Sequence, residues 1–536
     1  MQSDPLAMRP VWLTRMEWGV GLGVTLFAVW LHFSYLIHAG GLWRDEAGGV
    51  ALAALPKIAE TWQMQARDAF PLLIPMVVRG CTSIGLGTDE SLRLLGFVIG
   101  LSQLAAAWFF AWTVLKQPPL MILLLLGTNA VVVRWGDSLR AHGLGSGLML
   151  LTLAGLWRLV GEANWRRFLG AMVPALLSVQ CLYQNAFLLA AACAGAWVLC
   201  WRRKQARAAM LVLAVGVVAA VSLIPYVPLI RESQDWWMLE KTGFTVERLW
   251  SALSRAIGSS PPLLVPVWLG VLAIAAWSGF RAFNRVELGA QLFGATALFA
   301  GLVMFGAFVG LAQLPTQVWY WLPLMAYAAA CADAAWPRAP HGLQVARLVL
   351  TIVVTLICIP AGLEAVKCRQ TNANLIAIHL SKVVGDDDII IVHPWYNGVS
   401  FQRYYVGRAA WETLPPLSDH RFHRYDLVKE QLATENPIVP VLERVARVLR
   451  SGHRVWLVGN IPMPQPNQPP PADLPPAPRS AYAWDEEYYS YVWGLQLSDL
   501  LLRNAAEFGM ENVGDAGCIS PYENLSLQVA AGKKAP

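Results

Sequence analysis

The chain has 536 residues, of which 56% are hydrophobic and 14% charged, and its mean hydropathy is +0.45. Soluble domains carry about 25% charged residues, so this composition excludes a disordered chain, a coiled coil and a soluble nucleic-acid-binding domain. The net charge of +6 arises from 41 basic and 35 acidic residues in short clusters, so no polybasic arm for DNA or RNA is expected.

Apolar segments follow one another through the first two thirds of the chain, and most approach the roughly 20 residues that a membrane-spanning helix needs. The first follows Arg9 and Arg15 and lacks a clear cleavage site, so we interpret it as an uncleaved helix with a cytoplasmic N-terminus. The segments run near 17–38, 70–86, 92–115, 119–134, 143–160, 168–182, 184–200, 208–230, 261–280, 287–312, 318–336 and 343–362.

Basic clusters orient these segments, because Lys and Arg concentrate in cytoplasmic loops. They place the loops 39–69 and 231–260, and everything after 363, outside the cytoplasm. Three apolar segments lie between loop 39–69 and residue 143, although both of these points should be outside. One of the three must therefore fail to cross, and we expect the short 119–134 to be re-entrant. The chain should then have about 11 transmembrane helices. The basic residues used here are Arg158, Arg166, Arg167, Arg202, Arg203, Lys204, Arg207, Arg281, Arg285, Arg338 and Arg347.

Two carboxylates flank the first outer loop. Arg44-Asp45-Glu46 directly follows the first helix, and Arg67-Asp68 precedes the next apolar segment. Two carboxylates at one membrane–water boundary can bind a divalent cation or deprotonate a hydroxyl. The alternative is that these are interfacial charges that only hold the helix ends in place.

A second charged cluster lies at a later helix boundary. It contains Arg134, Asp137, Arg140 and His142. The two guanidinium groups can grip a phosphate while Asp137 orients them, or the charges can simply set the topology.

The polar part from 366 to 536 predicts a small α/β domain outside the membrane. Apolar runs at 389–392, 454–458 and 522–529 predict strands, 438–450 and 485–508 predict helices, and the Pro-rich 461–478 predicts a loop. Cys368 and Cys518 either pair as a disulfide or remain two free thiols. His420 and His423 are three residues apart, but no strict ligand spacing accompanies them, so a metal site is not expected there.

Five short motifs occur in a characteristic order, and on them the chain resembles the GT-C superfamily of polytopic glycosyltransferases. In particular it is similar to the branch of protein O-mannosyltransferase-like, aminoarabinose-transferase-like and lipopolysaccharide-core galacturonosyltransferase-like proteins. The motifs are Asp45-Glu46, Asp68 before Phe70-Pro71-Leu72, Arg93-Leu94-Leu95-Gly96, Arg140-Ala141-His142-Gly143-Leu144 and Trp319-Tyr320-Trp321-Leu322-Pro323. Four features depart from the family pattern: His142 replaces a frequent Tyr, Trp319 replaces an Arg, Gly96 replaces a Pro, and Pro71 alone remains of a usual pair of prolines.

The resemblance implies an all-α polytopic membrane domain of GT-C type over 1–365 and a C-terminal extracytoplasmic α/β domain over 366–536. It implies a hexosyl- or pentosyl-transferring enzyme that takes a sugar from a polyprenyl-phosphate donor, with inversion. The acceptor is a lipid, polysaccharide or protein hydroxyl on the outer face of the cytoplasmic membrane. A lipid or sugar transporter or flippase is the alternative, but no internal repeat supports it.

The resemblance also assigns roles to residues. Asp45 is the candidate base, Asp68 holds an acceptor or, with Asp45, a divalent metal, and Glu46 is a weaker catalytic candidate. The remaining candidates are Arg140, Arg44, Arg67, Asp137 and His142 for the donor phosphate, and Tyr320 for the donor or acceptor pocket. Gln317 lies near a predicted outer helix end, where it can either bind the donor or acceptor in the same pocket or form a hydrogen bond between helices.

Overall fold

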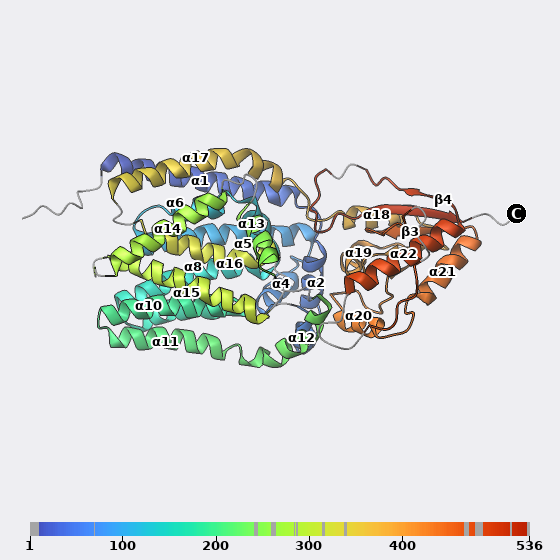
Figure 1. The fold of residues 1–536 in the computed structure, drawn as a ribbon, viewed down its shortest axis with the longest axis horizontal. Helices are drawn as coiled ribbons and strands as arrows, with labels where there is room; N and C mark the ends of the chain where they lie inside the picture. Colours follow the sequence, from blue (N-terminus) through green and yellow to red (C-terminus); the bar gives the residue numbers. More distant parts are fainter. Residues whose placement is uncertain are drawn as a thin grey trace, which may run out of the picture.

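The structure is a computed structural model that describes residues 10–68, 70–240, 245–258, 264–283, 285, 288–312, 317–336, 340–465, 471–477, 486–514 and 517–532. A bundle of long helices and a C-terminal α/β domain lie end to end along the longest axis of the molecule (Figure 1). We call the end of the bundle that carries this domain the domain end, and the opposite end the far end.

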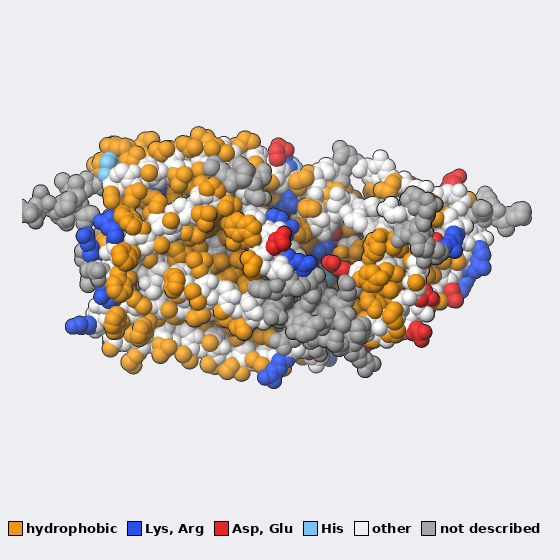
Figure 2. Space-filling model, in the orientation of Figure 1, with side chains coloured by type: hydrophobic (Ala, Val, Ile, Leu, Met, Phe, Trp, Pro, Cys, Tyr) orange, Lys and Arg blue, Asp and Glu red, His pale blue; other side chains and the backbone are white. Residues whose placement is uncertain are grey.

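Eight helices in the described residues are long and apolar enough to cross a membrane. Their apolar side chains cover the surface of the bundle in Figure 2. The chain is therefore a multi-pass membrane protein, as its hydropathy predicts. Six of these helices are α1 (Val11–His38), α8 (Ala141–Gly161), α10 (Asn185–Arg202), α14 (Leu264–Ala282), α15 (Gly289–Ala312) and α17 (His341–Val366). The other two are α5 (Asp89–Phe110), continued by the π-helical turn η2 (Ala111–Leu115), and α11 (Ala206–Val221), continued by η4 (Ile224–Tyr226) and α12 (Val227–Glu240).

Three shorter helical segments also run through the bundle. Two of them, α9 (Trp165–Cys181) and α16 (Leu322–Asp333), pack against α8. The third consists of α6 (Leu120–Ile122), the π-helical turn η3 (Leu123–Gly127) and α7 (Ala130–Gly136).

The third segment crosses the bundle from one end to the other. It starts at the far end, where the Ile122 N–H lies 3.5 Å from Asp333 at the end of α16. It ends at the domain end, where Arg134 donates to the Cys368 carbonyl just after α17. The expectation that 119–134 is re-entrant is therefore wrong.

The predicted segment that does not cross is α4 (Leu73–Ser83). Its 11 residues extend about 16 Å, roughly half of the hydrocarbon core of a bilayer. The chain on both sides of α4 touches the C-terminal domain, because Arg67 pairs with Asp426 and Asp89 pairs with Arg403. The eight long helices and the three shorter segments thus make eleven crossings in the described residues, close to the predicted number.

Short helices line the domain end of the bundle. They are α2 (Arg44–Ala53), α3 (Ile58–Met64), the turn η1 (Gln65–Arg67) and α13 (Val246–Ile257). The break between α2 and α3 contains Pro56, which has no N–H for a helical hydrogen bond.

The C-terminal domain is a five-stranded sheet with helices on both faces. The strand order is β2-β1-β3-β5-β4, in which β2, β1 and β3 are parallel and β5 and β4 are antiparallel to their neighbours. The strands are β1 (Ile389–Val392), β2 (Ala410–Thr413), β3 (Arg454–Val458), β4 (Ala505–Met510) and β5 (Leu527–Gly532). The helices and the turn are α18 (Ala373–Val383), η7 (Trp395–Asn397), α19 (Gly398–Tyr404), α20 (Tyr425–Leu432), α21 (Val439–Arg450) and α22 (Glu486–Asn504).

Alternate residues of the central strands bury into two separate cores, as strand geometry requires. Ile389 and Ile391 pack with α20, α21 and α22, whereas Ile390 and Val392 pack with α18 and α19. The predicted strands at 389–392 and 454–458 and the helix at 438–450 are confirmed. The prediction of a single helix over 485–508 is wrong at its end, because the chain turns into β4 from Ala505. The last strand starts at Leu527 rather than at 522.

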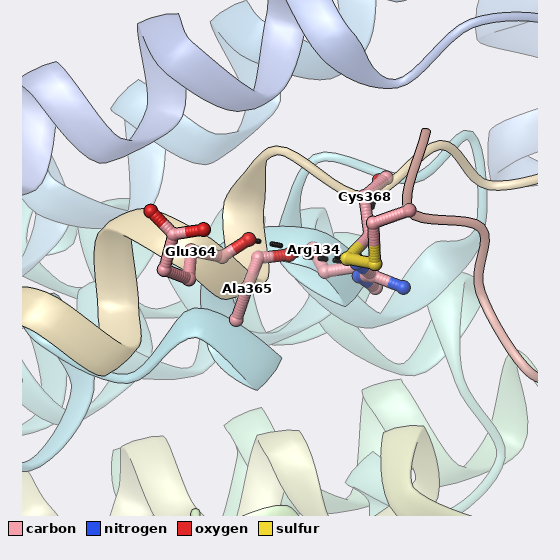
Figure 3. The surroundings of a disulfide bond; sticks show 5 residues. Arg134, Glu364, Ala365 and Cys368 are labelled. Carbon is pink, nitrogen blue, oxygen red and sulfur yellow. Dashed lines mark hydrogen bonds between the residues drawn. A yellow bond between two sulfur atoms is a disulfide. The ribbon is translucent and has the colours of Figure 1, made fainter. Parts of the chain in front are cut away.

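A disulfide joins Cys368, just after α17, to Cys518 in the segment before β5 (Figure 3). The two segments also exchange backbone hydrogen bonds, since the Arg369 N–H donates to the Cys518 carbonyl and the Ser520 N–H donates to the Arg369 carbonyl. Arg134 donates to the carbonyl groups of Ala365 and Cys368 and so supports the same junction from α7. These bonds hold the segment around 520 at the domain end of the bundle.

Candidate active site

Helix α2 begins directly after the first crossing and carries the acidic pair in its first turn. Glu46 accepts the backbone N–H of Trp43 at 3.3 Å, which is the carboxylate half of a capping box. Acidic side chains are favourable at this end of a helix because the first N–H groups carry partial positive charge. Successive helical residues point about 100° apart, so Asp45 and Glu46 face different surroundings.

Glu46 points into the protein and is fully buried. It accepts hydrogen bonds from Arg93 Nη1 at 2.9 Å and from the Leu139 backbone N–H at 3.0 Å. Arg93 also donates to the carbonyl groups of Gly40 and Gly41. The Glu46–Arg93 pair therefore fastens α2 to α5. This saturated, buried carboxylate does not support the prediction of a catalytic role for Glu46.

Asp45 faces the boundary between the bundle and the C-terminal domain, and its side chain is 20% exposed. Its carboxylate accepts no hydrogen bond from the residues that the structure describes. The nearest charged or titratable nitrogen atoms are Arg44 Nε at 3.6 Å, His423 Nε2 at 3.8 Å and Arg140 Nη2 at 4.0 Å. The carboxylate oxygens thus remain able to accept a hydrogen bond from a hydroxyl group, next to two permanent positive charges.

Arg140 brings the second predicted carboxylate to the same place. Its Nη1 atom lies 3.2 Å from Asp68 Oδ1 and 3.2 Å from the Asp45 backbone carbonyl. Its guanidinium group lies over the ring of Phe70, 4.3 Å from the ring centre. Asp45, Asp68 and Arg140, which are up to 95 residues apart in the sequence, therefore form one group at the domain end.

Arg44 connects this group to the C-terminal domain. Its Nη1 donates to the Tyr522 carbonyl at 2.7 Å, and its guanidinium lies 4.6 Å from the ring centre of Tyr396. The Arg44 backbone N–H donates to Glu523, which also accepts from Ser400 Oγ at 2.8 Å. Burial raises the pKa of Glu523 to about 7, although Arg44 opposes this rise. Arg44 therefore has several partners, and only part of its charge is available to a ligand.

Arg67 makes a second connection rather than facing the Asp45 group. Its Nη2 lies 2.8 Å from Asp426, which is bound at the same distance by Arg424. Arg424 also binds Asp419 at 2.7 Å. Burial alone would raise the pKa of Asp426, but the hydrogen bonds from Arg424 and Arg67 outweigh burial and lower it to about 2. These ion pairs hold the loop 419–426 against the bundle.

His142 and Tyr320 lie next to the charged group, on the side of Phe70. His142 is buried in the first turn of α8, with its ring 5.1 Å from that of Phe70 and 6.0 Å from that of Tyr320. Neither ring nitrogen of His142 has a hydrogen-bond partner among the described residues. Gln317 lies just before the turn η6 (Val318–Trp321), and no contact with Asp45, Asp68 or Arg140 is found for it in the described part of the chain.

Asp137 does not join the group that the sequence predicted for it. It is buried and binds His32 of α1 at 2.7 Å. Gly100 of α5 lies so close that a Cβ atom there would overlap the Asp137 carboxylate. The prediction that Asp137 orients Arg134 and Arg140 is therefore wrong, because Asp137 and Arg134 both serve helix packing instead.

The predicted divalent metal would need Asp45 and Asp68 to share a cation. The Arg140 guanidinium lies between these two carboxylates instead. Among the described residues, no group of three or more His, Cys, Asp or Glu side chains is arranged to hold a metal ion. These donors do not fit a metal shared by the two carboxylates, and an anionic ligand suits the cluster better.

The C-terminal domain turns the carboxyl ends of its parallel strands toward this group. Tyr396 follows β1 and His423 follows β2, and both lie next to α2. Ligands of open α/β sheets bind at this edge, because the loops that leave the strands converge there. The candidate site is thus built from two parts: the segment around α2 at the domain end of the bundle and the loops of the sheet.

Sequence reasoning missed the contribution of the C-terminal domain. His423, Asp426, Tyr396 and Glu523 lie more than 300 residues from Asp45, and no motif links them to it. The one available signal was the pair His420 and His423 after a strand. That strand, β2, was itself not predicted, because its four residues are not a buried apolar run.

No family model matches the chain, and no curated protein matches it. Among solved structures, it is similar to the crystal structure of ArnT from Cupriavidus metallidurans bound to undecaprenyl phosphate, with 13% identity and a TM-score of 0.51. This similarity covers 82% of the present chain and 92% of ArnT.

Two further structures show weaker similarity. Apo ArnT from the same organism has 13% identity and a TM-score of 0.48, covering 82% of this chain and 92% of that one. The arabinofuranosyltransferase AftD from Mycobacteria has 14% identity and a TM-score of 0.41, covering 99% of this chain but 40% of AftD. ArnT is a glycosyltransferase of the GT-C type, and the present chain has the GT-C fold that the resemblance predicted.

Proposed function

We propose that the chain is an integral-membrane glycosyltransferase that moves a sugar from a polyprenyl-phosphate donor to an acceptor hydroxyl. The observation that carries this proposal is the Asp45 carboxylate. It is free of hydrogen bonds in the described structure, yet it lies at the domain end beside Arg140 and Arg44. The GT-C fold, and the undecaprenyl phosphate in the similar ArnT structure, support a lipid-linked donor.

The reaction requires a base for the acceptor hydroxyl and positive charge for the leaving phosphate. The acceptor oxygen attacks the anomeric carbon, and the bond from that carbon to the phosphate oxygen breaks. The hydroxyl proton passes to the Asp45 carboxylate, while the polyprenyl phosphate leaves with the bonding electrons. This single displacement inverts the anomeric carbon. A phosphate monoester is already a good leaving group, so no strong general acid is needed.

Arg140 and Arg44 have different roles in this proposal. Arg140 binds the donor phosphate, and Asp68 fixes its guanidinium at 3.2 Å. Arg44 adds a second positive charge, fixed by the Tyr522 carbonyl. Such fixed charges stabilise a developing phosphate dianion without further reorganisation.

The basic residues support a site on the outer face of the cytoplasmic membrane. Helices α8, α10 and α14 carry Arg158, Arg202 and Arg281 in their last turns, all at the far end of the bundle. Lys and Arg side chains gather at that end in Figure 2. The positive-inside rule then places the far end in the cytoplasm and the C-terminal domain outside.

The test is sugar transfer by purified protein in nanodiscs. Radiolabelled polyprenyl-phosphate sugars are supplied with a membrane extract as acceptor, and wild type is compared with Asp45→Asn and Asp68→Asn. Glu90→Gln is the matched control, because Glu90 is an exposed acid at the same end of the bundle.

Transfer by wild type and Glu90→Gln, and its loss in Asp45→Asn, would support the proposal. Movement of labelled lipid across a sealed bilayer without transfer from any donor would overturn it and favour a flippase.

A further inference from the structure

The loop between β2 and α20 places an imidazole against the proposed base. His423 Nε2 lies 3.8 Å from Asp45 Oδ1, and the two side chains are 15% and 20% exposed. Asp45 is on α2 of the bundle, whereas His423 belongs to the C-terminal domain, 378 residues later in the chain. The contact therefore exists only because the sheet edge docks on α2.

The imidazole has a defined orientation. Its ring stacks on Tyr425 with an interplanar angle of 20° and meets Trp395 edge-on at 83°. The indole of Trp395 is itself fixed by a hydrogen bond to Glu486 at 2.9 Å. These contacts hold the ring while its Nε2 atom points toward Asp45.

The loop that carries His423 is fastened on both sides. Asp419 binds Arg424 at 2.7 Å, and Asp426 binds both Arg424 and Arg67 at 2.8 Å. The bond from Asp426 to Arg67 joins the loop to the bundle directly. A residue in such a loop has a fixed distance from α2, which suits a positioning role better than a merely space-filling one.

The groups that face His423 are Asp45 and Arg44 of α2 and Arg140 at the start of α8. Burial lowers the pKa of His423 to about 4, and the two arginines act in the same direction while Asp45 opposes them. The imidazole is therefore neutral at neutral pH. A neutral ring with its proton on Nε2 is a hydrogen-bond donor and adds no charge to the site.

We propose that His423 is a positioning residue of the glycosyl-transfer site: its Nε2–H donates to the Asp45 carboxylate and holds it toward the acceptor hydroxyl. This inference rests on the proposed function. The separation of 3.8 Å is about 1 Å longer than a hydrogen bond. Hydrogen bonds of catalytic groups are often long without substrate and shorten in the substrate complex.

The test compares two substitutions at the same position. His423→Gln keeps a donor near the place of Nε2, whereas His423→Met has a similar volume and no donor. We expect His423→Met to lower kcat by about 10- to 100-fold with an unchanged KM for the donor lipid, and His423→Gln to recover most of the rate.

His420 supplies the matched control. It is in the same loop but packs on Trp411, with ring centres 4.6 Å apart. We expect His420→Met to keep the wild-type kcat. If His423→Met does not fold, His423→Asn replaces it, since the shorter amide does not reach Asp45.

Each outcome has a distinct meaning. Equal rates for wild type and His423→Met would overturn the role of His423 and leave the proposed function intact. Equal losses in His423→Met and His423→Gln would assign His423 to packing only. Absence of transfer by wild type from every lipid-linked donor would refute the proposed function itself.

Discussion

The two adjacent acids of α2 should differ in how much stability the protein loses when each is replaced by its amide. Glu46→Gln removes the charge from a fully buried carboxylate that is 2.9 Å from Arg93. Breaking a buried pair on one side costs about 3–5 kcal/mol, because the remaining charge stays desolvated without a counter-charge. Asp45→Asn changes a partly exposed carboxylate whose ion pairs are 3.6–4.0 Å long. Such pairs contribute below about 1 kcal/mol.

The measurement is the unfolding midpoint of purified protein in detergent, followed by intrinsic fluorescence and size-exclusion recovery. We expect Glu46→Gln to unfold at a clearly lower temperature than wild type and Asp45→Asn to unfold with wild type. The double variant Glu46→Leu/Arg93→Met should recover part of the loss, since replacing both members of a buried pair by apolar groups is often neutral. The reasoning is refuted if Glu46→Gln is as stable as wild type, or if Asp45→Asn is the less stable of the two.

Three further predictions concern the site and its junction. Arg140→Gln should reduce kcat/KM for the lipid-linked donor by about 100-fold, because a charge of the proposed phosphate site is lost; an unchanged value in steady-state assays would exclude Arg140 from that site. A chelator should leave transfer unchanged, because Arg140 lies between the two carboxylates; loss of transfer that added metal restores would contradict this. The free energy of unfolding of wild type should fall relative to that of Glu523→Gln as the pH rises from 5 to 8. The difference between the two proteins should change by at most about 3 kcal/mol. Folded Glu523 keeps its proton up to about pH 7, so wild type loses stability as the pH rises from about 4.5 through 7; thermal unfolding curves with no pH-dependent difference between the two proteins would show that Glu523 has no raised pKa.

The sequence predicts the membrane part well because the bilayer constrains it strongly. A crossing must be apolar over nearly its whole length, so hydropathy finds the segments and basic clusters orient them. Two linked assignments are wrong, 119–134 as re-entrant and 70–86 as a crossing. The error at 119–134 has a physical cause. This segment crosses as short helices joined by a π-helical turn and is enclosed by other helices, so it does not need the length of a lipid-facing helix.

The candidate site could be predicted only in part from the sequence. Asp45, Asp68 and Arg140 were all proposed from the sequence, since charges next to apolar segments stand out. The different surroundings of Asp45 and Glu46 depend on Arg93 and Leu139, and only the packing of α2 on α5 reveals them. The contacts that the C-terminal domain makes with this site could not be predicted, because contacts between distant residues leave no periodic pattern in the sequence.

The most direct test of the account is the rate of sugar transfer by wild type and Asp45→Asn, in nanodisc preparations with matching unfolding midpoints. We expect inverted glycoside product from wild type and a rate at least about 100-fold lower for Asp45→Asn, since a general base contributes about that much or more. A rate for Asp45→Asn within a few-fold of wild type would contradict this expectation, because the carboxylate on α2 would then not be the base.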